Sequence, residues 1–97
     1  MKKSFNIKQK IWQWPGGQTV DGGWHFVTLD KKLSAEIRGV HKRGHVPVVA
    51  KVLKSTWNAS LLWHGMSSAY ILCITKKVRK EEDLFAGDEI RVSVVLK

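Results

Sequence analysis

The chain has 97 residues, of which 43% are hydrophobic, so it can build one domain with a modest core rather than remain disordered. Its 17 Lys and Arg against eight Asp and Glu give a net charge of +9, which attracts phosphates, nucleic acid or acidic protein partners. A chain this short buries only about 60–65% of its unfolded surface, so a large internal active-site cavity is not expected.

The single cysteine, Cys73, excludes an intramolecular disulfide and a zinc site built from several cysteines. It lies in the apolar run AYILCIT, which favours a small buried residue over a reactive thiol. No apolar segment resembles a signal peptide or approaches the ~18 residues of a membrane span. We therefore expect a cytoplasmic protein without a membrane partner, whose single domain covers residues 1–97. The sequence leaves open whether it is a monomer or a homodimer.

Residues 5–14 alternate in character and predict the first strand, with its apolar side chains on one face. A proline and four glycines end this strand, and the aromatic and β-branched residues 24–29 predict a second one. Three aromatic residues are expected in the core: Trp24, Phe26 and Trp57.

Residues 30–39 change to helical spacing, because Leu33 and Ile37 lie four positions apart. Asp30 can act as the N-cap of this short helix, and Gly39 can close its C-terminus.

The rest of the chain predicts four strands and a second short helix. Pro47, near the start of the first of these strands, favours an edge or first-residue position. The helix is entered from Thr75, and the last strand places alternate aliphatic residues on one face. The strands are expected at residues 46–54, 56–63, 69–75 and 89–96, and the helix at residues 76–84.

The predicted order is β-β-α-β-β-β-α-β, a mainly β chain with six short strands and two short helices. Short strands of this kind close into a barrel or a split barrel, because closure removes exposed sheet edges. The segments HFVTLDKKL and YILCITKKV echo each other. If the echo reflects a repeat, each half is a β-β-α-β unit and the barrel has pseudo-two-fold symmetry.

The glycine-rich segment between the first two strands does not match a phosphate-binding loop. Gly17 and Gly22 have the spacing of a Walker A loop, but Gly23 and Trp24 stand where Lys and Ser or Thr are required. The segment also joins two strands, whereas a dinucleotide loop joins a strand to a helix. The glycines are therefore interpreted as turn residues.

Basic and aromatic residues share the second face of the first predicted strand. Such a stripe can stack bases beside a charged groove. Alternatively, its indoles pack over one end of the barrel, where their N–H groups find local partners. The residues of the stripe are Lys8, Lys10, Trp12 and Trp14.

A second group of candidate anion-binding residues begins the second predicted helix. Four cations precede three acids there, which makes the start of the helix electropositive, although a solvated helix face explains the same pattern. Two more cations lie in the loop before residue 46. The candidates are Lys76, Lys77, Arg79, Lys80, Lys42 and Arg43.

No constellation of catalytic or metal-binding residues emerges from the sequence. His41 and His45 have the spacing of a helical metal pair, but Gly44 and Pro47 place them in a loop, and no acid lies nearby. The acids cluster in a helix end and a turn, and no serine sits in a nucleophile elbow. We expect no catalytic residues, no metal and no cofactor, and a protein that is not an enzyme.

The segments GGWHFVTL, VPVVAKV and YILCITKKVRKEEDLFAGDEIRVSVVL resemble a small bacterial family, number 1905 in the series of domains of unknown function. That family also occurs fused ahead of a bacteriocin-protection, OmpD-associated type of domain. The resemblance implies a double-split β-barrel, as in AbrB- and MazE-like regulators, and it implies no catalytic residues.

The sequence supports, as its main functional hypothesis, weak binding of nucleic acid or another polyanion through the basic candidates. The alternative is a protein-interaction module that acts with a fused or neighbouring partner. A third hypothesis, an enzyme or small-ligand binder, requires a pocket lined by His25, His45 or His64 together with an acid.

Overall fold

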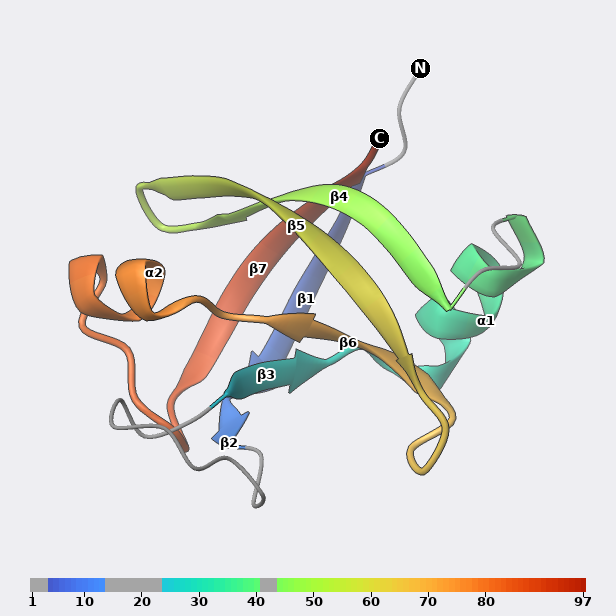
Figure 1. Ribbon diagram of the computed structural model, residues 1–97, viewed down its shortest axis with the longest axis horizontal. Helices are drawn as coiled ribbons and strands as arrows, with labels where there is room; N and C mark the ends of the chain where they lie inside the picture. Colours follow the sequence, from blue (N-terminus) through green and yellow to red (C-terminus); the bar gives the residue numbers. More distant parts are fainter. Residues whose placement is uncertain (1–3, 14–23, 41–43) are drawn as a thin grey trace.

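The computed structural model describes residues 4–13, 24–40 and 44–97 (Figure 1). Seven strands form one sheet in the order β1-β7-β4-β5-β6-β3-β2, and all neighbouring strands are antiparallel. The elements are β1 Ser4–Lys10, β2 Trp12–Gln13, β3 His25–Thr28, α1 Lys31–Val40, β4 His45–Val52, β5 Ser55–His64, β6 Ala69–Cys73, α2 Lys76–Glu81 and β7 Glu89–Leu96.

The sheet has seven strands rather than the predicted six, because the first predicted strand is divided at Ile11. β1 and β2 are consecutive in the chain, yet they form the two opposite edges of the sheet. One residue spans less than about 4 Å, so the sheet must curl until its edges meet. The backbone N–H of Ile11 donates to the carbonyl of Asp88 (2.9 Å), and the carbonyl of Ile11 accepts from Gly87 N–H (2.7 Å). The mainly β fold is thus confirmed as a curled half-barrel with two short helices.

The core fills the inside of this curl. Alternate residues of β4 and β7 are buried there, as period two requires when one face of a strand packs inward. Each helix adds one fully packed aliphatic residue, Ile37 from α1 and Val78 from α2. Figure 1 shows the two helices at opposite ends of the curled sheet, α2 at the left and α1 at the right. Within the described ranges, neither helix is long and apolar enough to traverse a lipid bilayer.

Both predicted helix starts are confirmed, but both helix ends differ. Asp30 Oδ1 accepts from Leu33 N–H (2.6 Å), and Thr75 Oγ1 accepts from Val78 N–H (3.3 Å), so both residues are N-caps. α1 continues through Gly39 to Val40, and α2 ends at Glu81 instead of residue 84. The shorter α2 is followed by Asp83 with φ of 55°, a left-handed conformation that ends a helix.

Pro47 lies inside the sheet and not in an edge strand, contrary to the sequence prediction. β4 pairs with β5 on one side and with β7 on the other. The register with β7 begins only at Val48, so Pro47 lies just outside that ladder, where its missing N–H is tolerated. Its carbonyl still accepts from Lys97 N–H (3.2 Å).

Ser34 attaches α1 to the sheet. Its fully buried hydroxyl oxygen accepts from the backbone N–H of Tyr70 in β6 (3.0 Å). A buried donor that loses its acceptor costs about 1–3 kcal/mol.

We predict that Ser34→Ala lowers the free energy of unfolding by about 1–3 kcal/mol, measured by urea denaturation. The matched control is Glu36→Ala, an exposed position on the same helix that should change stability by less than about 0.5 kcal/mol. Equal stabilities for the two variants would show that the buried hydroxyl does not hold α1 on the sheet.

Candidate functional site

The outer side of the sheet, opposite the core, carries an apolar surface. The register aligns Trp12 of β2 with Phe26 of β3, and Phe26 with Cys73 of β6. A second row joins Thr28, Ile71 and Leu62. Residues next to these along each strand belong to the core, so the two rows point outward. They flank an open cavity of about 350 Å³, here called the aromatic hollow, which is lined by Trp24, Phe26, Leu62, Trp63, His64 and Ile71.

Two tryptophans flank Phe26 on this surface. Trp24 stacks on Phe26 with nearly parallel rings (centroids 6.3 Å apart, 10° between planes). Trp12 lies on the other side, tilted against Phe26 at 5.1 Å and against His64 at 5.8 Å. Trp12 Nε1–H donates to Thr28 Oγ1 (2.8 Å), which fixes the indole. Trp12 does not line the aromatic hollow, but it contacts two residues that do, Phe26 and His64.

Trp24 is 56% exposed, so the prediction that it lies in the core is wrong. It precedes β3, and its ring packs on the outer side of the sheet instead of the inside of the curl. Phe26 is buried as expected, at 5% exposure, but on the outer side as well. Trp57 is half-buried against the core, in agreement with its prediction.

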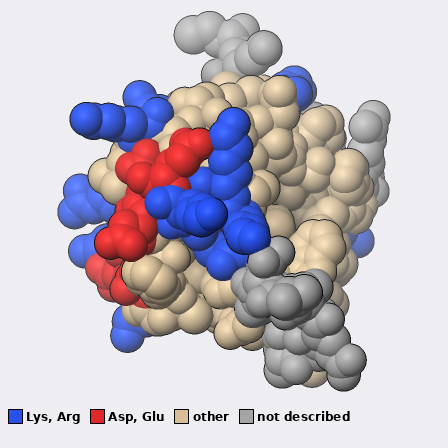
Figure 2. All heavy atoms as spheres, turned by 60° about the vertical axis from the view of Figure 1, so that its left-hand side comes forward, with Lys and Arg blue, Asp and Glu red and all other residues tan. Residues whose placement is uncertain are grey.

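A basic pocket lies beside α2. It has a volume of about 220 Å³, and three of the predicted cations contribute to it. Arg79 Nε–H donates to the carbonyl of Ile74 (3.3 Å), which holds the guanidinium against the sheet. Figure 2 shows Lys and Arg atoms gathered beside Asp and Glu atoms on the side of the molecule that carries α2. The lining residues are His25, Lys76, Arg79, Lys80, Asp83, Leu84 and Phe85.

Two acidic residues at the end of α2, Glu81 and Glu82, bond Ser55 rather than line the basic pocket. Ser55 Oγ, at the start of β5, lies 3.0 Å from Glu81 Oε2 and 2.7 Å from Glu82 Oε2. These two carboxylates therefore face the β5 end of the sheet, and neither lines the basic pocket. Among the described residues, Asp83 supplies the carboxylate that does line it, against three cations.

Arg79 connects the aromatic hollow to the basic pocket. Its Nε–H donates to the carbonyl of Ile74, the residue after Cys73, so the guanidinium lies beside this end of β6. Burial raises the pKa of the Cys73 thiol, and the positive charge of Arg79 opposes that shift. Cys73 in turn continues the outward row that begins with Trp12 and Phe26. His25, which lines the pocket, follows Trp24, which lines the hollow, but the two side chains point to opposite sides of the sheet. The two features are therefore neighbours where β3 and β6 meet α2, with the hollow on the outer side of the sheet and the pocket beside the helix.

The remaining predicted residues lie elsewhere. Lys8 forms an ion pair with Glu89 of β7 (3.2 Å). Lys10 is exposed, and its partner in the register of β1 and β7 is also Glu89. Because the first strand is divided, these lysines lie on β1 and Trp12 lies on β2, so the predicted stripe is not continuous. Lys77 forms an ion pair with Glu81 (Nζ to Oε1, 4.0 Å) and does not line the basic pocket. Three candidates lie outside the described residues: Trp14, Lys42 and Arg43.

The histidines are dispersed. His25 is buried and lines the basic pocket together with Asp83, the pairing of histidine and acid that a small-ligand site would require. His64 lines the aromatic hollow, and His45 is exposed at the start of β4. His41 falls outside the described part of the chain.

These features define a small domain built on a curled antiparallel sheet, with an aromatic surface on its outer side and a basic pocket beside α2. The chain matches a family described as a domain of unknown function, DUF1905, over residues 8–94, and it belongs to that family. No curated protein matches the chain.

We predict that the Cys73 thiol reacts with iodoacetamide more slowly in the folded protein than in the urea-unfolded protein at the same pH. Burial raises its pKa, so less thiolate is present in the folded state. Mass spectrometry of the alkylated fraction over time measures the two rates. Equal rates would contradict the burial of this thiol.

The same shift has a consequence for stability. A thiol whose pKa is raised on folding stabilises the fold below the ordinary thiol pKa of about 8.5, and this contribution is lost as the pH rises through the folded-state pKa. The free energy of unfolding of the wild type should therefore fall more steeply above pH ~8.5 than that of Cys73→Ala. Parallel pH profiles for the two proteins would contradict the raised pKa.

Proposed function

We propose that this domain is a non-enzymatic binding module for single-stranded nucleic acid, which lies across the aromatic hollow and the basic pocket. The observation that carries the proposal is the position of Arg79, which lines the basic pocket and donates to Ile74, next to the residue that pairs with Phe26 under the exposed ring of Trp24. Proteins that bind single strands combine these two elements, since bases stack on aromatic rings and phosphates contact cations.

Each part of the face has a distinct role. Trp24, already stacked on Phe26 and more than half exposed, offers a ring to an unpaired base. Arg79 and Lys80 offer positive charge to the adjacent phosphates. A single strand suits this arrangement better than a duplex, because bases in a duplex are already stacked on one another and cannot reach Trp24.

The AbrB- and MazE-like double-split barrel with two related halves remains a prediction. Such a fold would suggest DNA binding by analogy with those regulators. This analogy is weak support for a function, because one fold serves many functions. A nucleic-acid partner would also place the protein in the bacterial cytoplasm. The analogy thus agrees with the proposal, which depends on the residues of the face.

The alternative function is a protein-interaction module. The observation that favours it is the apolar lining of the aromatic hollow, with Trp24 exposed at its rim. Exposed aromatic rings of this kind anchor protein interfaces by receiving apolar side chains. The two functions differ in salt dependence, since apolar burial is not weakened by moderate salt whereas phosphate contacts are.

We predict that fluorescence anisotropy with a labelled mixed-sequence single-stranded DNA or RNA shows binding at 50 mM salt. With about three phosphate contacts, affinity should fall roughly 20-fold between 50 and 200 mM salt. Trp24→Ala should weaken binding about 5- to 100-fold without changing the salt dependence, because it removes stacking alone. Lys80→Gln should weaken binding and reduce the salt dependence.

The matched control is Lys77→Gln, which removes the same charge from the same helix but from a residue outside the basic pocket. It should bind nearly as well as the wild type. Absence of binding at 50 mM salt, or equal losses for Lys77→Gln and Lys80→Gln, would reject the proposed face. Binding of an apolar peptide that is insensitive to salt and lost in Trp24→Ala would instead support the interaction module.

A further inference from the structure

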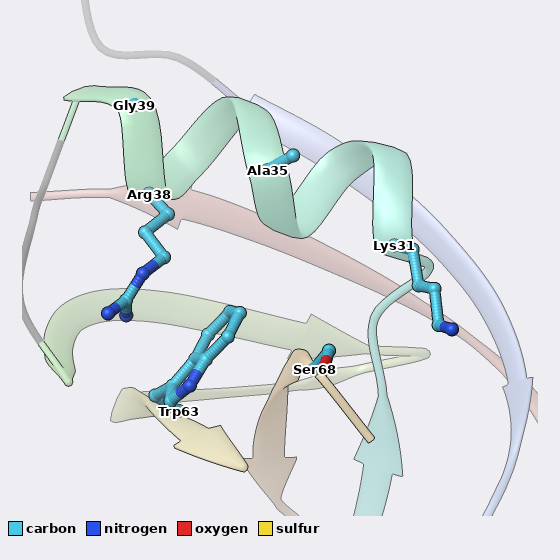
Figure 3. A pocket seen from close by; sticks show the side chains of 6 residues that line it. All are labelled: Lys31, Ala35, Arg38, Gly39, Trp63 and Ser68. Carbon is cyan, nitrogen blue, oxygen red and sulfur yellow. The ribbon is translucent and has the colours of Figure 1, made fainter. Parts of the chain in front are cut away.

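A second cavity lies between α1 and the hairpin formed by β5 and β6, on the side of the molecule opposite α2 (Figures 1 and 3). It is a shallow groove of about 480 Å³, open to solvent. Two cations and one aromatic ring line it, and no lining residue is acidic. The residues of this groove, here called the α1 groove, are Lys31, Ala35, Arg38, Gly39, Trp63 and Ser68.

The guanidinium of Arg38 is held in place by Trp63. It lies 4.2 Å from the centroid of the indole, and Figure 3 shows the side chain reaching from the helix toward this ring. Trp63 is itself fixed by an edge-on contact with the buried ring of Tyr70 (5.2 Å, 78°). A stacked guanidinium keeps its N–H donors at the edge of its plane, where they match the two oxygens of a carboxylate. Arg38 is therefore prepared to receive a carboxylate.

Lys31 lies at the other end of the same groove. It precedes Arg38 by seven residues, which is two helical turns or about 10.5 Å along the axis. Within the described part of the chain, neither Lys31 nor Arg38 forms an ion pair with an acid. The residues between these ends are small: Ala35 bears one methyl group, and a Cβ at Gly39 would meet no atom within 4 Å. The helix thus presents two separated charges with open space between them.

We propose that the α1 groove binds an acidic peptide segment in the polyproline II conformation, whose two carboxylates are three residues apart. This conformation has three residues per turn and rises about 3.1 Å per residue, so the two carboxylates share one face about 9 Å apart, close to the spacing of Lys31 and Arg38. The segment between the carboxylates would lie over Ala35 and Gly39. This site shares Trp63 with the aromatic hollow, but it shares no cation with the proposed nucleic-acid face, so carboxylate binding here does not depend on that function.

A peptide fits the α1 groove better than a nucleic acid does. Base binding requires a free aromatic face, but the face of Trp63 is covered by Arg38 and its ring contacts Tyr70. A carboxylate requires only the in-plane donors of the guanidinium and the ammonium of Lys31. The open shape of the groove suits a chain that passes across it, whereas a small molecule needs a site that encloses most of its surface.

The experiment measures anisotropy of a labelled octapeptide with the central sequence Glu-Pro-Pro-Glu, which favours the polyproline II conformation, bound to the full chain at low salt. The peptide with both Glu replaced by Gln should bind at least tenfold more weakly. Arg38→Gln should reduce affinity about tenfold, and Lys31→Gln should reduce it severalfold. The matched control is Lys32→Gln, on the same helix but outside the α1 groove, which should leave affinity unchanged.

Gly39→Leu provides a steric test that leaves the charges intact. The position is helical and has open space around it, so a larger side chain fills the groove without disturbing the fold. Affinity should fall at least fivefold, while the free energy of unfolding stays equal or rises.

Several results would overturn the proposal. Equal binding of the Gln peptide, or unchanged affinity in both Arg38→Gln and Lys31→Gln, would remove the basis for carboxylate recognition. Competition by a single-stranded oligonucleotide that depends on Arg38 would assign the groove to nucleic acid. A concentration-dependent rise in molar mass that Arg38→Gln abolishes would identify a second copy of the chain as the occupant. Oligonucleotide binding by Trp24→Ala tests the proposed nucleic-acid face only. A failure of that function is therefore distinguishable from a failure of peptide binding in the α1 groove.

Discussion

The architecture depends on the closure of the sheet at Ile11. This residue connects the two edge strands of the sheet, and its N–H and carbonyl both bond the turn before β7. Because so short a connection cannot span an open sheet of seven strands, the sheet must curl, and the curl encloses the core. The buried side chain of Ile11 packs inside that core, so backbone and side chain enforce the same closure.

The closure also determines which residues meet on the outer side. It places β2 against β3, so Trp12 lies beside Phe26 and donates to Thr28. Lys8 lies on β1 instead and forms an ion pair with Glu89 of the neighbouring strand β7. The basic character of the face therefore comes from α2, through Arg79, rather than from the first strand. Cys73 ends the aromatic row, and the next residue, Ile74, accepts the hydrogen bond from Arg79.

The local signals in the sequence predict most elements, because they act over a few residues. Asp30 and Thr75 are recognisable N-caps, and alternate aliphatic residues mark β7. The division at Ile11 is not visible in the sequence, since the alternation continues through it. The exposure of Trp24 likewise depends on which side of a curled sheet it reaches, a property of long-range pairing.

The candidate site was predictable in part for the same reason. The run of cations that begins α2 is a local feature, and three of its members line the basic pocket. The contribution of His25 and the link from Arg79 to Cys73 require β3, β6 and α2 to be adjacent. The α1 groove joins Lys31 and Arg38 to Trp63, which lies in β5. A pattern read along one segment cannot reveal that contact.

The most direct test of the proposed face is an NMR titration of the isotope-labelled protein with a single-stranded oligonucleotide, followed through the side-chain N–H signals of tryptophan and arginine. The indole signal of Trp24 and the Nε–H signal of Arg79 should shift together and saturate at the same oligonucleotide concentration. The indole signal of Trp57 should remain in place, because this ring lies against the core and lines neither the aromatic hollow nor the basic pocket. Shifts at Trp63 with Trp24 unchanged would contradict the account.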